Sequence, residues 1–172
     1  MGKIFFCADT HFNHKNIIKY CNRPFKDVDE MNEVIINNWN SVVSDDDTIF
    51  FLGDFVLGNR EQIIEFGSKL KGHKILQVGN HDRATTKAFI DAGFETVYKK
   101  PTIINFNEYG ITVRISHAPI YDREDNYFNI CGHVHQENIN DANHFCVSME
   151  QINYTPIELS KIVEYMKEVR KN

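Results

Sequence analysis

Short apolar segments alternate with longer amphipathic ones in the first half of the chain. Residues 3–9, 48–54 and 73–80 are rich in Ile, Val, Leu and Phe, a composition typical of buried strands. Between these segments, residues 27–43 and 59–70 place their apolar side chains at helical spacing. This alternation predicts βαβ units with parallel strands.

Both amphipathic segments begin with a helix-capping pattern. Asp27 precedes Glu30 by three positions, and Asn59 precedes Gln62 by the same interval. In a capping box the first side chain accepts a backbone N–H of the first helical turn, and the second reaches back to the cap. We therefore expect helices to begin directly after Asp27 and Asn59.

The C-terminal segment, residues 155–171, also has a helical pattern. Thr155 is the expected N-cap, Pro156 suits the first helical position, and Glu158 is the matching capping-box acid.

The second half of the chain has the pattern of strands joined by turns. Residues 102–119 predict two strands around a tight turn at 107–110, and residues 127–135 and 144–151 predict further strands. This half indicates an antiparallel or mixed sheet. Together, the two halves predict two sheets packed face to face with helices outside.

Length and composition fit one domain over residues 1–172. The chain has 172 residues, 42% of them hydrophobic, which is enough for a substantial core and too few for a second domain. The four cysteines show no paired metal-binding spacing, so reduced, buried thiols are expected. No apolar segment is long enough for a membrane span or a secretory signal, which favours a cytoplasmic protein without a membrane partner.

The charge of the chain argues against one class of partner. The formal net charge is −5, with 19 basic and 24 acidic residues scattered along the chain. Binding to extended duplex nucleic acid needs a basic surface that neutralises phosphates. That function is therefore disfavoured.

Five short polar motifs each follow a predicted strand. In open α/β sheets, the loops at the carboxyl ends of the strands converge on one crevice, so these motifs should meet. Their polar side chains are Asp9, His11, Asp54, Asn80, His81, Asp82, His117, His133 and His135.

This set of Asp, Asn and His side chains suits divalent first-row metal ions. Buried carboxylates and imidazoles without compensation would cost many kcal/mol of desolvation, and bound cations supply that compensation. There are too many candidate ligands for one tetrahedral ion, but they are enough for two ions roughly 3.5 to 4 Å apart that share a carboxylate.

The order and spacing of these motifs resemble the calcineurin-like metallophosphoesterase superfamily. Its blocks D-x-H, G-D, G-N-H-[ED], a single His and G-H-x-H all stand between Asp9 and His135. The resemblance implies an α/β fold, a four-layer α/β/β/α sandwich of two mixed sheets. It also implies two divalent cations, with manganese favoured and iron, zinc, nickel, cobalt or magnesium as alternatives.

The resemblance further implies a role for each motif residue. Two cations around one water would make a hydroxide available to attack phosphorus in line. His81, off the metals, would assist the leaving oxygen, and Asp82 would orient His81 or a neighbouring loop. The implied ligands are Asp9, His11 and His135 on one ion, Asn80, His117 and His133 on the other, and Asp54 as the bridge.

Two residues outside the motifs are candidates for phosphate contact. His14 lies just past His11, and Arg23 follows in the same segment. An imidazole and a guanidinium can both bind phosphate oxygens. The alternative interpretation is a solvated helix face.

Departures from the superfamily pattern narrow the expected substrate. Leu57 and Gly58 stand where the protein phosphatases have Asp and Arg, so protein phosphatase activity is not expected. Nine residues separate His117 from the next predicted strand, which leaves no room for a nucleic-acid-binding cap. We expect hydrolysis of small phosphodiesters of nucleotide or cyclic-nucleotide type. The alternatives are a small phosphomonoester substrate and a non-catalytic scaffold like the retromer subunit of this fold, and the sequence leaves the oligomeric state open.

Overall fold

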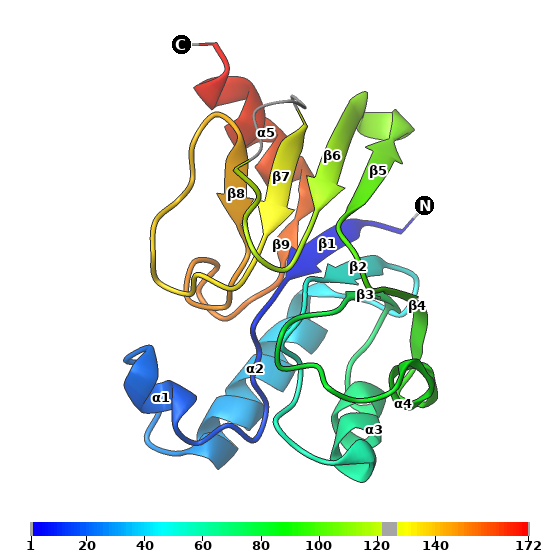
Figure 1. Cartoon of the computed structure of the whole chain (residues 1–172), viewed down its shortest axis with the longest axis vertical. Coiled ribbons are helices and arrows are strands. Elements are labelled where there is room, and N and C mark those ends of the chain that lie inside the picture. The colour runs from blue at the N-terminus through cyan, green and yellow to red at the C-terminus, as the bar shows by residue number, and fades with distance from the viewer. Residues whose placement is uncertain (1, 122–126, 172) are drawn as a thin grey trace.

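The first sheet contains five strands and has the predicted parallel core. The computed structural model describes residues 2–121 and 127–171 (Figure 1). The strand order in this sheet is β4-β3-β2-β1-β9, with β1 to β4 parallel and β9 antiparallel to β1. The strands are β1 (Ile4–Cys7), β2 (Thr48–Phe51), β3 (His73–Gln77), β4 (Phe94–Tyr98) and β9 (Ile157–Glu158).

The second sheet contains four strands and is also mixed. Its order is β5-β6-β7-β8, in which β5 and β6 form the predicted antiparallel pair and β6, β7 and β8 run parallel. A single 3₁₀ turn, Asn107–Tyr109, joins β5 to β6. The strands are β5 (Thr102–Phe106), β6 (Ile111–Ile115), β7 (Phe128–Cys131) and β8 (His144–Cys146).

Side chains alternate along the strands and so divide the core in two. In β1, Phe5 and Cys7 pack in one cluster with side chains of α2, α3 and α4, including the fully buried Trp39. Phe6 lies on the opposite face, in a second cluster with residues of β6, β7, β8 and α5. The helices are α1 (Ile17–Tyr20), α2 (Val28–Val42), α3 (Arg60–Ser68), α4 (Thr86–Asp91) and α5 (Leu159–Val169). Two mixed sheets with flanking helices confirm the predicted fold class (Figure 1).

The predicted helix caps are present at two of the three sites. Asn59 and Gln62 form the full reciprocal capping box of α3. The side chain of Asp27 accepts from the Glu30 N–H at 2.9 Å, as expected. The Glu30 carboxylate, however, accepts the N–H of Lys26 and not that of Asp27.

The predicted start of the C-terminal helix is wrong. Thr155 is not its N-cap, because α5 begins at Leu159 with Glu158 at the cap position. Residues 157 and 158 pair with Phe6 and Phe5 as β9, which extends the first sheet by one strand. A tertiary strand pairing has therefore replaced the first turn expected from local sequence.

All four cysteines are free, and Cys7, Cys131 and Cys146 are buried while Cys21 is half-buried. Within residues 2–121 and 127–171, every helix is too short or too polar to cross a bilayer.

Candidate metal centre

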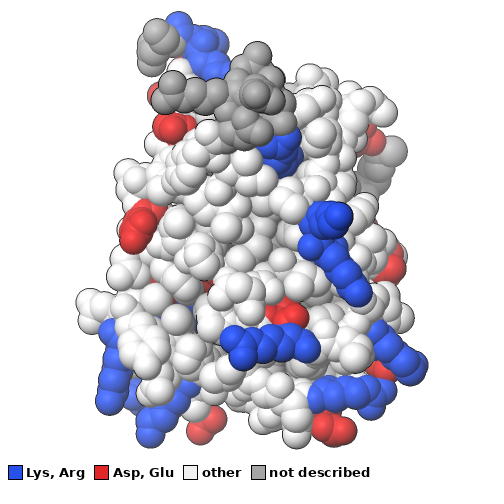
Figure 2. All heavy atoms as spheres, in the orientation of Figure 1, with Lys and Arg blue, Asp and Glu red and all other residues white. Residues whose placement is uncertain are grey.

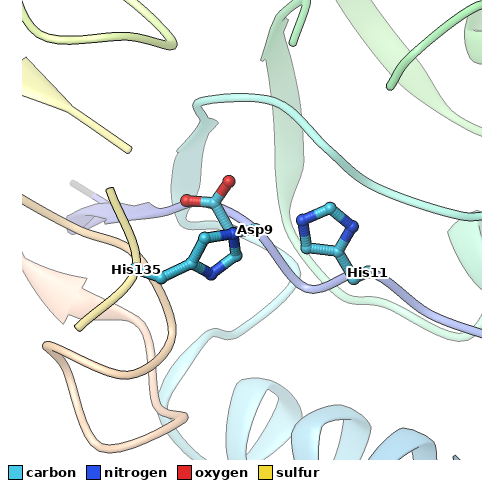
Figure 3. A group of neighbouring side chains, drawn as sticks. All are labelled: Asp9, His11 and His135. Atoms are coloured by element: carbon cyan, nitrogen blue, oxygen red, sulfur yellow. The ribbon is translucent and has the colours of Figure 1, made fainter. Parts of the chain in front are cut away.

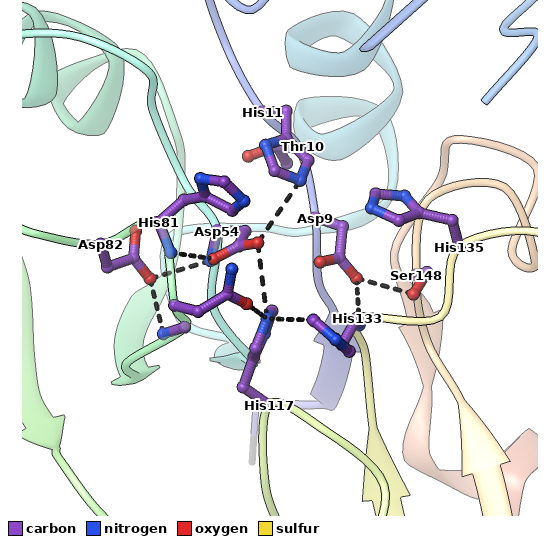
Figure 4. A network of polar contacts seen from close by, with 12 residues as sticks. Asp9, Thr10, His11, Asp54, His81, Asp82, His117, His133, His135 and Ser148 are labelled. Carbon is purple, nitrogen blue, oxygen red and sulfur yellow. Dashed lines mark hydrogen bonds and ion pairs between the residues drawn. The ribbon is translucent and has the colours of Figure 1, made fainter. Parts of the chain in front are cut away.

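The predicted polar motifs all lie at the carboxyl ends of strands and meet between the two sheets (Figure 4). Asp9 and His11 follow β1, and Asp54 follows β2. The residues that follow β3, β6 and β7 are Asn80, His81, Asp82, His117, His133 and His135.

Asp9, His11 and His135 form the first group, called here the buried triad (Figure 3). One ligand atom from each of these side chains lies within 4.8 Å of the others. Asp9 Oδ2 accepts hydrogen bonds from Ser148 Oγ at 2.6 Å and from the His133 N–H at 2.8 Å. Asp9 Oδ1 and His11 Nε2 are buried without a hydrogen-bond partner among the described residues. Buried polar atoms normally have partners, and a cation bound here would supply one. Carboxylate and imidazole groups are suitable ligands for such a cation.

Asp54, His117 and His133 form the second group, called here the open triad. Their ligand atoms also lie within 4.8 Å of one another. Asn80 Oδ1 lies 2.9 Å from His117 Nε2, and His133 Nδ1 lies 3.1 Å from the same atom. His117 Nδ1–H donates to the Leu52 carbonyl at 2.7 Å, which turns Nε2 toward the other three side chains. Asn80 and His133 are exposed, so this triad is more open to solvent than the first.

Asp54, a member of the open triad, also approaches the buried triad. Its Oδ2 is 3.5 Å from His11 Nε2 and 3.4 Å from His117 Nε2. Its Oδ1 accepts the backbone N–H of His81 at 2.9 Å. The carboxylate is thus placed where a ligand shared by two ions would stand.

Five of the candidate ligands have a left-handed backbone conformation. The φ values are 61° for Asp9, 49° for His11, 61° for Asp54, 74° for His133 and 51° for His135. Non-glycine residues in this region cost of order 1–3 kcal/mol each and concentrate at functional sites. The fold therefore holds these side chains toward the centre against a local conformational preference.

Two motif glycines give the carboxylates room. A Cβ at Gly79 would meet Asp54 Oδ1, and a Cβ at Gly132 would lie 2.7 Å from Asp9 Oδ2. A larger residue at either position would push a carboxylate out of the centre.

Burial and the paired charges set the protonation of the centre. Burial raises the pKa of Asp9, and it lowers the pKa of His11 to about 3. For Asp54, burial is outweighed by the hydrogen bond and charge of His117, which lower its pKa to about 2. For His117, burial is likewise outweighed by Asp54 and Asp9, which raise its pKa to about 9. A cation that binds the open triad must therefore displace a proton from His117 at neutral pH.

A buried ion pair between Arg23 and Glu150 contacts His135 of the buried triad. His135 Nδ1 lies 3.0 Å from Glu150 Oε1, and Arg23 Nε donates to the same oxygen at 2.8 Å. The other two guanidinium nitrogens of Arg23 donate to the carbonyls of Asp9 at 2.7 Å and Thr10 at 2.9 Å. The Arg23 side chain is fully buried, so it does not face solvent as the predicted phosphate contact requires. In the structure, Arg23 fixes the backbone that carries Asp9.

The predicted catalytic and phosphate-contacting residues lie beside the triads. The exposed ring of His81 is centred 5.5 Å from that of His11, and the half-buried ring of His14 is centred 5.4 Å from it. Burial lowers the pKa of His14. The Asp82 carboxylate accepts the N–H groups of three residues, which fits the expected role of orienting a neighbouring loop. These donors are Asp54, Phe55 and Gly79.

Sequence reasoning missed Ser148 and Glu150, which contact Asp9 and His135. Both residues follow β8. The rule used for the other motifs, a polar residue directly after an apolar strand, could have found them.

Comparisons with known proteins agree with this geometry. Residues 2–166 match the Metallophos family, described as calcineurin-like phosphoesterase. The chain is 35% identical over 176 residues to the uncharacterized protein MJ1445 of Methanocaldococcus jannaschii, covering 97% of this chain and 93% of that protein. It is also 38% identical over 85 residues to the Gene 66 protein of Mycobacterium phage L5, covering 48% of this chain and 41% of the phage protein.

Two solved structures share the fold. The protein of unknown function AQ665 from Aquifex aeolicus has a TM-score of 0.76 at 27% identity, covering 95% of this chain and 99% of that chain. The Pseudomonas putida nuclease MPE has a TM-score of 0.51 at 17% identity, covering 77% of this chain and 61% of the nuclease. The second likeness concerns the fold alone.

Proposed function

Because the chain belongs to the calcineurin-like phosphoesterase family, we propose that it hydrolyses small phosphodiesters with two divalent metal ions. The observation that carries this proposal is the position of Asp54, which belongs to the open triad and also lies 3.5 Å from His11 of the buried triad. The buried triad with Asp54 would hold one ion. The open triad with Asn80 would hold the other, and manganese suits this mixture of carboxylate, amide and imidazole donors.

When bound, two such ions supply an activated water and offset the negative charge of the phosphate. The protein's own groups would do the rest. His81, with its exposed imidazole next to His11, would donate a proton or hydrogen bond to the leaving oxygen. Asp82 would hold the loops after β2 and β3 together through its three backbone hydrogen bonds. His14 is close enough to the triads to contact a phosphate oxygen.

The surface charge favours small substrates over long duplexes. Figure 2 shows basic side chains scattered over one face, most of them in its lower part, with acidic ones among them and no continuous basic stripe among the described residues of that face. The net charge of the whole chain is −5. Long-duplex binding by phosphate neutralisation would therefore be weak at physiological salt.

Turnover of bis-p-nitrophenyl phosphate and of p-nitrophenyl phosphate tests this proposal. With manganese, the diester should be hydrolysed faster than the monoester, and Asp54→Asn should abolish both activities. Faster turnover of the monoester would instead favour a phosphomonoesterase. If protein loaded with manganese, iron, zinc, nickel, cobalt or magnesium hydrolysed neither ester, the scaffold alternative would replace this proposal.

A further inference from the structure

A pocket of about 440 Å³ opens beside His81, outside both triads. It lies between the loop that follows β2, with the start of α3, and the loop that follows β3, with α4. None of the candidate metal ligands lines it, and His81 and Asp82 are the residues it shares with the centre described above. Its volume is within the range of small-molecule sites.

One wall of the pocket is apolar. Val56, Ile63 and Phe89 are 7%, 3% and 1% exposed, and Leu57 is 47% exposed. Leu57 and the neighbouring Gly58 are uncharged and line the pocket together with His81. They provide an uncharged surface beside His81, on which a planar ring can pack.

The rim of the pocket carries two arginines, of which one has an ion-pair partner. Arg60 is paired with Asp91 at 2.5 Å, so its charge is already offset. Arg83, two residues past His81, is exposed, and its guanidinium has no hydrogen-bond or ion-pair partner within the described parts of the chain. A free guanidinium next to an apolar wall suits a ligand with both a ring and a phosphate.

We propose that this pocket binds the leaving group of the substrate, and that it selects a nucleoside that carries a second phosphate. This inference rests on the proposed function, because the leaving group is placed by His81. The base packs on the wall formed by Leu57 and its neighbours, and the second phosphate pairs with Arg83. The substrate class is then a dinucleotide or an oligonucleotide end that bears a terminal phosphate.

Dinucleotides that differ in the terminal phosphate test the inference. The substrates are the thymidine dinucleotide TpT and its phosphorylated forms pTpT and TpTp, so that either orientation in the site is sampled. For one of the two phosphorylated forms, the wild type should show a KM about tenfold below that for TpT, as expected for a charge-assisted hydrogen bond. Arg83→Gln should remove this difference. Lys87→Gln changes an exposed cation on α4 that does not line the pocket, and it should leave the difference in place.

Binding of thymidine 3′,5′-bisphosphate to the metal-loaded protein gives a second measurement. Its Kd by calorimetry should rise about tenfold in Arg83→Gln and also rise in Leu57→Asp, because both alter the pocket. Neither residue is buried, so both variants should fold. An unchanged Kd in both variants, or equal KM values for the three dinucleotides in the wild type, would overturn the inference.

Methyl p-nitrophenyl phosphate separates this inference from the function on which it rests. Its p-nitrophenyl leaving group carries no second phosphate, so turnover of this ester does not depend on the proposed phosphate contact, and the control variant Lys87→Gln, outside the pocket, should turn it over within about twofold of the wild-type rate. If the wild type does not hydrolyse this ester, the proposed function fails. If it does, and Arg83→Gln keeps the preference for a terminal phosphate, only the subsite is wrong.

Discussion

His81 joins the candidate metal centre through its backbone and keeps its imidazole exposed. Its N–H donates to Asp54 Oδ1 at 2.9 Å, and this bond does not depend on the side chain. His81→Ala should therefore keep the wild-type metal content. Its rate should fall about 10²- to 10⁴-fold on an alkyl diester and much less on a p-nitrophenyl diester, because a nitrophenolate leaves without a proton. Rates measured on both diesters at equal metal occupancy check this.

Equal losses on the two diesters would remove the leaving-group role from His81. Loss of an ion in this variant would instead show that the histidine assignments are wrong.

Glu150 lies between Arg23 and His135, and it contacts the candidate metal centre through His135. Burial opposes its ionisation, but the hydrogen bond to His135 and the charge of Arg23 lower its pKa to about 2. We expect Glu150→Gln to weaken metal binding at the buried triad about 10- to 100-fold, because the imidazole loses the carboxylate that orients it. Competition with a chelator measures this affinity. Glu137→Gln, an exposed change in the loop that carries His135, is the control and should match the wild type.

For single residues, the sequence predicted which motif side chains would meet, but it did not predict the partners of Arg23. Strand ends converge in this fold, so the position of a residue after an apolar strand predicted which side chains would meet. The partners of Arg23 were not predictable in this way. Its contacts with Glu150 and with the carbonyls of Asp9 and Thr10 join parts of the chain up to 127 residues apart.

At the scale of elements, the turn before β2 depends on a single carboxylate. Asp47 accepts the N–H of Lys3 at 2.6 Å and the N–H and hydroxyl of Ser44 at 2.7 Å each. Burial opposes ionisation of Asp47, but these bonds outweigh it and lower its pKa. A lowered folded-state pKa contributes stability above the unfolded value, and this stability is lost as the pH falls through the folded value.

Asp47→Asn should therefore unfold more easily than the wild type at neutral pH, by about 1–2 kcal/mol, and the difference in unfolding free energy should narrow as the pH falls below the ordinary pKa of an aspartate. Urea unfolding of the metal-free proteins across this pH range measures the gap. Asp45→Asn changes an exposed neighbour and should show no such trend. A gap that stays constant with pH would mean that the charge of Asp47 does not stabilise the turn.

The elements differ in how well local sequence predicted them. The capping box of α3 is a contact within four residues, so the pattern of Asn59 and Gln62 was sufficient. The start of α5 was misplaced because β9 forms only by pairing with β1, and the paired residues are 151 and 153 positions apart in sequence. The strand β4 and the helix α4 were not predicted at all. Both lie in a segment whose short apolar runs acquire their partners from α3 and β3.

At the scale of the whole molecule, the two triads depend on one shared carboxylate. The wild type should bind two ions per chain, and Asp54→Asn should lose both, because the amide brings no charge to the position between them. Metal analysis of the purified proteins tests the stoichiometry. A wild type that saturates at one ion would contradict the dinuclear centre.

The same dependence predicts the response to a chelator. Ions bound only by the native state stabilise it by about 2.7 kcal/mol when present at 100 times their Kd. A chelator should therefore lower the melting temperature of the wild type and leave that of Asp54→Asn unchanged.

The left-handed backbone of five candidate ligands implies that the metal-free protein would be more stable without those side chains. His133 has a φ of 74° and an exposed side chain, so glycine would relieve the backbone there with little loss of packing. In excess chelator, His133→Gly should unfold at a higher temperature than the wild type, by about 0.5–1 kcal/mol in free energy, whereas His133→Ala should not. Selection for metal binding would then keep a histidine that selection for stability alone would replace. The bound ions would restore the folding stability that the left-handed backbone costs.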